Sequence, residues 1–320
     1  MDLRQLDYFV HVAELGSFSR AATLLSVAQS ALSARVRHLE VELKQPLLHR
    51  NGRGVTPTEA GKRLLQHARG ILMQVNRTRE ELDALRGKPA GRLVIGVPTT
   101  IARLLTLPWL KSFHSHFPGA SVGMMEGLSN YVTEWVSTGR ADIGIVFNAQ
   151  ASPALEIVPL LEEAMYLVAP PGTRLRAKEI RLRDVPRYPL IIPSRPNANR
   201  MLVEMQLGHL GLKPTIALEL DSIASVLDAV RENYGYSLLP PTSLRSYEGG
   251  EEFVVRPVRP RLLIPISLIV SAQRPTTPLG QQALTLLRNV AGEVLAPDAA
   301  AGRAAPRKAQ KKGGTEAALG

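Results

Sequence analysis

The residues near the start of this chain that could do chemistry are small polar and basic side chains at helical spacing. Gln and Ser can hydrogen-bond the edges of DNA bases, and Arg can bind guanine or a phosphate. The candidates for such contacts within residues 18–37 are Ser26, Gln29, Ser30, Ser33, Ala34 and Arg37. An ordinary solvated helix face carries similar residues, so this pattern alone leaves both interpretations open.

Two arginines flank an Asn-Gly pair a few residues later. Residues 47–58 have the sequence LLHRNGRGVTPT, which is typical of a short hairpin that turns at Asn51 and Gly52. A basic hairpin beside a helix–turn–helix is suited to phosphates or the minor groove, which makes Arg50 and Arg53 candidate DNA contacts. Plain surface solvation is the alternative for both arginines, and their position beside the turn tip argues against it.

A second set of polar residues lies at the ends of predicted strands in the C-terminal two thirds of the chain. Hydroxyl and amide groups at helix starts lie beside free backbone N–H groups, a combination that favours an anion such as a carboxylate. The candidates for binding a small molecule there are Thr99, Thr100, Ser129, Phe147, Asn148, Pro193, Ser194, Arg195 and Ser222. Thr99 and Ser222 could instead be plain helix caps.

Enzymatic chemistry finds little support in the sequence. The chain has no cysteine, which excludes disulfides, thiolate metal sites and cysteine nucleophiles. The histidines are scattered, and His114 and His116 would diverge on a helix rather than bind one metal ion. No phosphate-binding loop, nucleophile elbow or dinucleotide fingerprint lies between a predicted strand and helix. We therefore expect no catalytic residues, no metal and no cofactor.

Composition and charge favour a multidomain protein with an anionic partner. The 320 residues exceed what one core usually holds, so two or three domains are expected. The 39 Lys and Arg against 28 Asp and Glu give a net charge of +11, which suits nucleic acid or an acidic membrane surface. A merely soluble basic protein has the same excess. No segment reaches the ~18 apolar residues of a membrane span, and the start lacks a signal-peptide pattern, so a cytoplasmic protein is expected.

Three short helices should position the N-terminal candidates. Apolar residues recur at helical spacing over 3–15, over about 18–25 and over about 29–43, with a turn at 26–28. In the third helix one narrow arc should be buried, formed by Leu32, Val36, Leu39 and Leu43. The opposite arc then carries the polar candidates, which is the arrangement of a helix–turn–helix.

A single long helix is predicted from Thr58, a suitable cap, to about Arg86. Its apolar positions repeat every three or four residues, as in a two-stranded coiled coil. The predicted dimer seam is formed by Leu64, Ala68, Ile71, Val75, Leu82 and Leu85. A helix packed in a bundle is the alternative. Residues 87–91 contain Gly and Pro and predict a hinge.

Strands alternate with helices from residue 92 onward, which predicts a parallel sheet covered by helices. The expected strands are 93–97, 120–126, 142–147, 164–169, 190–192, 216–220, 237–239 and 264–270, and the expected helices are 99–117, 128–137, 197–210, 222–232 and 277–295. Two lobes joined by two crossings would enclose a cleft beyond the strand ends. The predicted parts are one lobe at 91–161 plus 267–295, a second at 162–266, and a disordered basic tail at 296–320.

These elements and two sequence segments resemble the LysR-type transcriptional regulators. The segments are LRQLDYFVHVAELGSFSRAATLLSVAQSALSARVRHLEVEL at 3–43 and RGVTPTEAG at 53–61. The resemblance is dense over 1–70, continues more thinly to about 295, and is greatest with the nitrogen-assimilation-control branch. Ser30, Lys44 and Leu48 depart from the usual Pro, Gly and Phe. Lys44 is therefore expected to adopt a positive φ, and Ser30 is where base preference could differ.

The resemblance implies an α/β multidomain protein. It has a winged helix–turn–helix over 1–58, a linker helix and hinge over 59–90, and an effector-binding domain over 91–295 that is similar to periplasmic binding proteins, with YGYSLLP at 234–240 matching one of its segments. The implied function is transcription regulation in the bacterial cytoplasm and nucleoid. The implied partners are inverted-repeat double-stranded DNA, a second copy in a dimer and then a tetramer, a carboxylate-bearing effector, and RNA polymerase as a further candidate. An effector-independent regulator and a cytoplasmic solute-binding protein are the alternatives.

Overall fold

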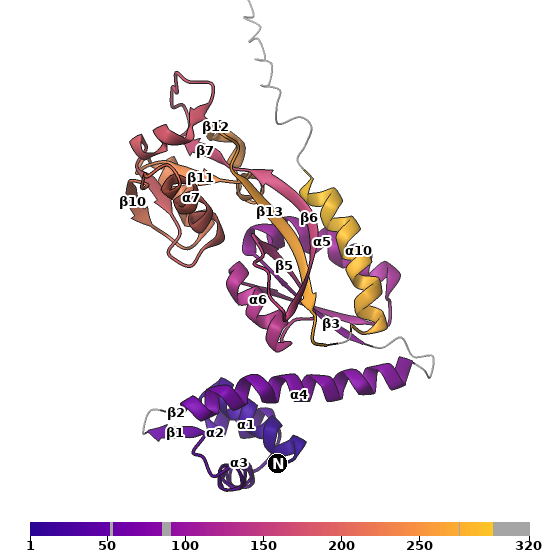
Figure 1. Ribbon diagram of the computed structural model, residues 1–320. Coiled ribbons are helices and arrows are strands. Elements are labelled where there is room, and N and C mark those ends of the chain that lie inside the picture. Colours follow the sequence, from indigo (N-terminus) through magenta and orange to yellow (C-terminus); the bar gives the residue numbers. More distant parts are fainter. Residues whose placement is uncertain (52–53, 85–90, 275, 297–320) are drawn as a thin grey trace, which may run out of the picture.

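The computed structural model shows an N-terminal helical head, one long helix and a two-lobed α/β domain (Figure 1). It describes residues 1–51, 54–84, 91–274 and 276–296. The predicted hinge residues 87–90, the seam residue Leu85 and nearly all of the predicted tail lie outside the described residues.

The head is built on three helices, α1 (Leu3–Leu15), α2 (Phe18–Leu24) and α3 (Gln29–Glu42). Asp2 caps α1 in a capping box, and Gly16, in the left-handed region, ends it. The head core contains Leu6, Phe9, Leu32, Val36 and Leu39. This confirms the predicted buried arc of α3 except at Leu43, which is 36% exposed. The prediction for Leu43 is wrong because α3 ends at Glu42 and Lys44 turns the chain with a φ of 51°, the positive value expected there.

The wing is an antiparallel hairpin of β1 (Leu48–Asn51) and β2 (Gly54–Pro57), as predicted. Its second strand is bonded to the head, because the Val55 N–H donates to the Gly16 carbonyl at 3.0 Å. Arg53 at the tip lies outside the described residues.

The long helix α4 (Glu59–Ala84) begins where the Thr58 hydroxyl accepts from the Gly61 N–H at 3.0 Å, the predicted cap. The residues predicted to form the dimer seam differ in burial along this helix. Ala68 is fully buried in the core of its own head, and Leu64 packs against that core. Including Ala68 in the seam is therefore wrong, since α1 already covers this turn of α4. Ile71 and Leu82 are 38% and 55% exposed and stay available to a partner.

The first lobe is a five-stranded sheet in the order β4-β3-β5-β13-β6. Its strands are β3 (Arg92–Val97), β4 (Ser121–Glu126), β5 (Ile143–Phe147), β6 (Leu155–Ala164) and β13 (Leu263–Ser271). Strands β3, β4 and β5 are parallel, but β13 is antiparallel to both β5 and β6, so the expectation of a fully parallel sheet is wrong. The reason is β13, which returns from the second lobe at the carboxyl ends of β5 and β6 and therefore runs against both. The strand β6, which was not predicted, has the same direction as β5 and lies on the other side of β13.

Helices cover both faces of this sheet. Helices α5 (Thr99–His116) and α10 (Pro278–Leu295) pack on one face, where Trp109, Phe113 and Leu287 are fully buried. Helix α6 (Ser129–Thr138) packs on the other, through Val132 and Val136 against Ile269.

The second lobe has a four-stranded sheet in the order β11-β7-β12-β8 and a parallel pair β10-β9. An isolated parallel bridge between Leu190 and Tyr236 lies between the two. The strands are β7 (Tyr166–Ala169), β8 (Ile180–Arg181), β9 (Leu190–Ile192), β10 (Ile216–Glu219), β11 (Ser237–Leu239) and β12 (Val254–Arg259), and the helices are α7 (Ala198–Gly208), α8 (Ile223–Arg231) and α9 (Pro241–Arg245) with 3-10 turns at Leu182–Arg187 and Gly250–Glu252.

The chain crosses between the lobes where β6 ends at Ala164 and where β13 begins at Leu263, two residues that pair with each other. The predicted boundaries at 161/162 and 266/267 therefore lie inside these two long strands. Figure 1 shows β6 and β13 running side by side towards the second lobe.

Candidate functional site

The start of helix α3 is open to solvent. Its N-cap residue, Ala28, has no side chain that can accept from the N–H groups of the first turn. Those N–H groups and the positive end of the helix dipole favour a phosphate oxygen. Gln29 is exposed there, and its Oε1 accepts from the Ser19 hydroxyl of α2 at 2.9 Å. The turn between the helices thus presents an oriented amide beside an anion-binding helix end.

The wing is fixed to the same helix through Arg50. Its guanidinium donates from Nη1 to the Ser33 hydroxyl at 3.2 Å and lies over the Phe18 ring, 4.5 Å from the centroid. A cation over an aromatic face is held without losing its charge. Arg50 therefore links α2, α3 and the wing while its exposed side chain keeps its charge at the surface. Ser33 is half-buried and is occupied by this bond.

Glu40 makes the second connection between α3 and the wing. Its Oε1 accepts from the backbone N–H groups of Leu47 and Leu48 at 2.8 and 3.1 Å. Sequence patterns could not identify this role, because one carboxylate on a polar helix face gives no sign of the strand that will lie beside it.

The remaining head candidates share one exposed surface. Ser26, Ser30, Ala34 and Arg37 are all exposed, and Ser26 has a φ of 53°. Arg37 has no hydrogen-bond or ion-pair partner in the described part of the chain, whereas Arg35 pairs with Asp2 at 3.6 Å. Arg37 is therefore an unpaired cation beside the polar face of α3.

A cleft of about 1070 Å³ lies between the two lobes. Six of the nine predicted residues line it, and they are Thr99, Thr100, Ser129, Phe147, Asn148 and Ser222. The Ser129 hydroxyl accepts from the Phe147 N–H at 3.0 Å, which ties the start of α6 to the end of β5. The prediction that strand ends and helix starts meet at this cleft is confirmed for the first lobe.

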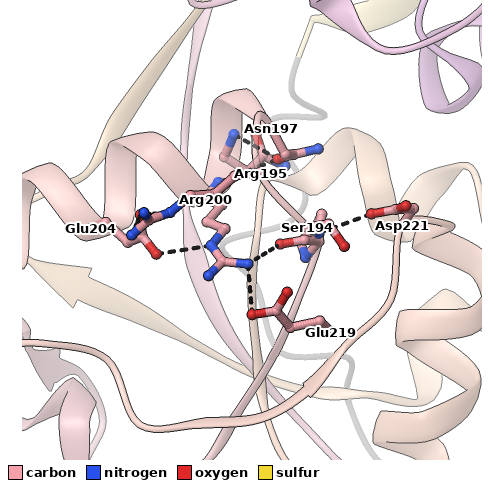
Figure 2. Close-up of polar contacts among 9 residues, drawn as sticks. Ser194, Arg195, Asn197, Arg200, Glu204, Glu219 and Asp221 are labelled. Carbon is pink, nitrogen blue, oxygen red and sulfur yellow. Dashed lines mark hydrogen bonds and ion pairs between the residues drawn. The ribbon is translucent and has the colours of Figure 1, made fainter.

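Pro193, Ser194 and Arg195 do not line the cleft, which corrects the prediction for the second lobe. Figure 2 shows that this segment is bound to a polar network. The Arg195 guanidinium pairs with Glu204 at 2.9 Å, and the Ser194 N–H donates to Asp221 at 2.9 Å. The residues that line the cleft come next in the chain, at 196–199.

Arg200 is the centre of this network. Its side chain is 7% exposed and donates to Glu204 at 2.8 Å, to Glu219 at 3.0 Å and to the Pro193 carbonyl at 3.0 Å. Burial alone would raise the pKa of Glu204, but hydrogen bonds from Arg195 and Arg200 outweigh burial, and the pKa lies below its ordinary value. The ionised pair therefore anchors α7 and the wall of the cleft to β10.

The helix starts on the two sides of the cleft differ. In the second lobe Asn197 caps α7 by accepting from Asn199 N at 3.0 Å, and Ser222 caps α8 by accepting from Ser225 N at 3.5 Å. In the first lobe the N-cap residues of α5 and α6 are Pro98 and Leu128, which offer no side-chain acceptor. The Ser222 cap matches the plain structural alternative considered for it, whereas α5 and α6 keep first-turn N–H groups for a ligand.

Three further residues of the cleft were not predicted. Arg103, one turn into α5, is exposed and has no ion-pair partner among the described residues. Asp221 lines the second lobe, and the buried Asn199 has a side-chain oxygen without a hydrogen-bond partner in the described structure. Helical spacing from Thr99 could have suggested Arg103, but the other two depend on how α7 packs on β10.

A buried carboxylate lies at the crossing between the lobes. Glu163, at the end of β6, is 2% exposed and accepts from the backbone N–H of Thr242 at 3.2 Å and from its hydroxyl. Burial raises the pKa of Glu163, although both hydrogen bonds from Thr242 oppose the rise. Since Ser243 and Ser246 of the same segment line the cleft, Glu163 connects the crossing strand to the cleft wall.

Within the described ranges, no group of three or more His, Asp or Glu side chains could hold a metal ion. Among the described residues, no helix combines the length and the apolar character of a membrane span.

Two family models match the chain. The model described as "Bacterial regulatory helix-turn-helix protein, lysR family" matches residues 3–62, and that described as "LysR substrate binding domain" matches residues 86–292. A nitrogen assimilation regulatory protein nac from Klebsiella aerogenes is 34% identical over 90% of this chain and 94% of its own length.

Solved structures share the arrangement. A full-length OxyR from Pseudomonas aeruginosa superposes with a TM-score of 0.71 at 24% identity, covering 91% of this chain and 94% of that chain, which supports the fold. Full-length CbnR in complex with its target DNA has a TM-score of 0.65 at 25% identity and covers 91% of this chain and 100% of that chain.

Proposed function

We propose that this chain, which belongs to the LysR family of DNA-binding transcriptional regulators, binds inverted-repeat promoter sites as a dimer of dimers. A small effector is proposed to control this binding. Members of this family are regulators rather than enzymes. The observation that carries the proposal is the head surface around the uncapped start of α3, where Gln29 accepts from Ser19 of α2 and the wing arginine Arg50 donates to Ser33 of α3.

The DNA-binding part is tested by selecting bound duplexes from a random pool with the full chain. We expect an enriched inverted repeat whose half-sites lie about one helical turn apart, because two symmetry-related recognition helices would enter successive major grooves. A pool that shows no enriched repeat at moderate salt would contradict sequence-specific binding. The enriched sequence would also identify candidate promoters in the bacterial nucleoid, where RNA polymerase is a candidate partner.

The dimer is proposed to form through the outer half of α4. Ile71 and Leu82 expose apolar side chains there, and Val75 lies between them on the same stripe. Sedimentation of Leu82→Glu should show dissociation at concentrations where the unmodified chain is dimeric, because the substitution places a charge in the seam. Asn76→Glu, an exposed change on the side of the helix away from this stripe, is the matched control. Equal dimer stability of both variants would remove Leu82 from the interface.

The effector is proposed to bind in the inter-lobe cleft. An open space of about 1070 Å³, with helix N–H groups on its wall, supports a ligand-dependent regulator over the effector-independent alternative. The solute-binding alternative does not account for the winged head. Thermal unfolding in the presence of small carboxylic acids tests the effector, since a ligand at 100 times its Kd adds about 2.7 kcal/mol. No stabilisation by any acid, with normal DNA binding, would favour the effector-independent regulator.

A further inference from the structure

We propose that the effector is a zwitterion of the amino-acid class, held with its carboxylate towards the first lobe and its ammonium group towards the second. This inference rests on the proposed effector site and specifies the chemistry of its ligand. It comes from the different polar groups that the two lobes present to one cleft.

The first lobe presents groups that favour a carboxylate. Helices α5 and α6 both begin at the cleft, and neither Pro98 nor Leu128 caps the N–H groups of the first turn. The same wall carries one cation, Arg103, which has no ion-pair partner among the described residues, and one carboxylate, Glu126, so the uncapped N–H groups decide its preference for an anion. Backbone N–H groups at a helix start and a guanidinium together bind an anion more strongly than either alone.

The second lobe presents acceptors instead. Asp221 is the charged residue that this lobe contributes to the cleft wall, and its Oδ1 accepts from the Ser194 N–H at 2.9 Å. Its other oxygen has no partner in the described part of the chain. Asn199, 8% exposed on the same wall, has an unpaired side-chain oxygen. Because α7 and α8 are capped by their own side chains, this lobe favours a hydrogen-bond donor rather than a second anion.

The space between these two sets of groups is apolar. Tyr131 and Trp135 of α6 face the cleft from one side, and Met201 and Met205 of α7 line it from the other. Methionine and aromatic side chains adapt to large apolar groups. The amino acid is therefore expected to carry a large apolar side chain, and L-phenylalanine is a suitable probe.

The test compares three ligands that differ in one charged group each. Calorimetric titration of the full chain uses L-phenylalanine, 3-phenylpropanoate, which lacks the ammonium group, and 2-phenylethylamine, which lacks the carboxylate. We expect L-phenylalanine to bind roughly tenfold more tightly than 3-phenylpropanoate, because only L-phenylalanine has an ammonium group that can donate a hydrogen bond to Asp221. In Asp221→Asn this preference should disappear, while the amide still accepts from the Ser194 N–H and preserves the loop. Asp184→Asn, a change at a half-buried position of the second lobe that pairs with Arg187 and does not line the cleft, should retain the preference.

Each other outcome has a distinct meaning. Equal binding of L-phenylalanine and 3-phenylpropanoate would overturn the zwitterion but leave a carboxylate effector in place. Loss of the preference in Glu126→Gln, with Asp221→Asn unchanged, would overturn the orientation, because Glu126 belongs to the first lobe. Binding of none of the three probes, nor of the small carboxylic acids above, would count against the effector site itself.

Discussion

The head and the cleft differ in how far their polar groups are already paired. In the head, Gln29 accepts from Ser19, and Arg50 connects Ser33 to the Phe18 ring. In the cleft, the starts of α5 and α6 have no side-chain cap, while the paired residues of the second lobe lie beneath the wall in the Arg200 network. The polar groups of the head are thus paired with one another, whereas the cleft combines a paired network in the second lobe with uncapped helix starts in the first.

This difference suggests different consequences of substitution. A residue that supports the head should change DNA binding for every sequence, and a residue that contacts a base should change binding for some sequences only. A residue in the network beneath the cleft should change stability first. The predictions below test this division, beginning with the largest expected effect.

Removing Glu204 should produce the largest loss of stability. In Glu204→Ala the buried Arg200 keeps the Pro193 carbonyl and the half-exposed Glu219 but loses its best-buried partner. Breaking a buried pair costs about 3 kcal/mol, so the free energy of unfolding in urea should fall by about that amount at neutral pH. Glu293→Ala, an exposed change on α10, should cost less than about 0.5 kcal/mol. Equal losses in the two variants would show that the network does not support the wall.

The pH dependence of this effect has a definite sign. Because the pKa of Glu204 is lowered in the folded chain, its contribution is complete above the ordinary carboxyl pKa and is lost as the pH falls through the folded value. The stabilities of the unmodified chain and Glu204→Ala should therefore converge in acid.

Gln29→Ala and Ser33→Ala should separate base reading from support. An amide bound to a base edge is worth about 1–3 kcal/mol of discrimination, so Gln29→Ala should reduce the preference for one base position by up to that amount. Ser33→Ala should weaken all duplexes alike, because it releases Arg50 from α3. Fluorescence anisotropy on the selected site and on single-base variants measures both. If Ser33→Ala relaxes one position and Gln29→Ala does not, the two roles are exchanged.

Arg37→Ala should have a smaller and uniform effect on DNA binding. Arg37 is exposed and unpaired within the described structure, which suits a phosphate contact. Loss of one phosphate contact should lower the slope of log K against log salt by about 0.9, with unchanged base preference. Arg35→Ala is the control, since Arg35 already pairs with Asp2. An unchanged slope in Arg37→Ala would place this residue outside the DNA interface.

The difference between the head and the cleft also explains which features could be predicted from the sequence. The helices of the head and its wing follow from local spacing, caps and turn residues, and the structure has them where expected. The positive φ of Lys44 was expected from the family resemblance, in which Gly is usual at this position, and the structure has it too. Strand β6 was missed because its alternation is interrupted by Pro159 and by consecutive charged residues at its end. The segment 193–195 was misplaced because its partners Arg200, Glu204 and Asp221 come from parts of the second lobe that only tertiary packing brings together. Local signals predict elements well, but they do not show which way a loop turns.

The smallest expected effect concerns Glu163 at the crossing between the lobes, and it tests whether an ionised carboxylate supports the crossing as Glu204 supports the cleft wall. Burial raises the pKa of Glu163, so the folded chain binds this proton more readily than the unfolded chain does. The free energy of unfolding should therefore gain a contribution as the pH falls from above the raised pKa to the ordinary carboxyl value. Glu163→Gln keeps an acceptor for the Thr242 N–H but has no titrating carboxyl group. At neutral pH its free energy of unfolding should equal that of the unmodified chain or exceed it by up to about 1 kcal/mol, and this advantage should disappear in acid. Urea unfolding across this pH range, with Glu293→Gln as an exposed control, measures the difference. A Glu163→Gln chain that is less stable at neutral pH would show that the ionised carboxylate supports the crossing, as Glu204 supports the cleft wall.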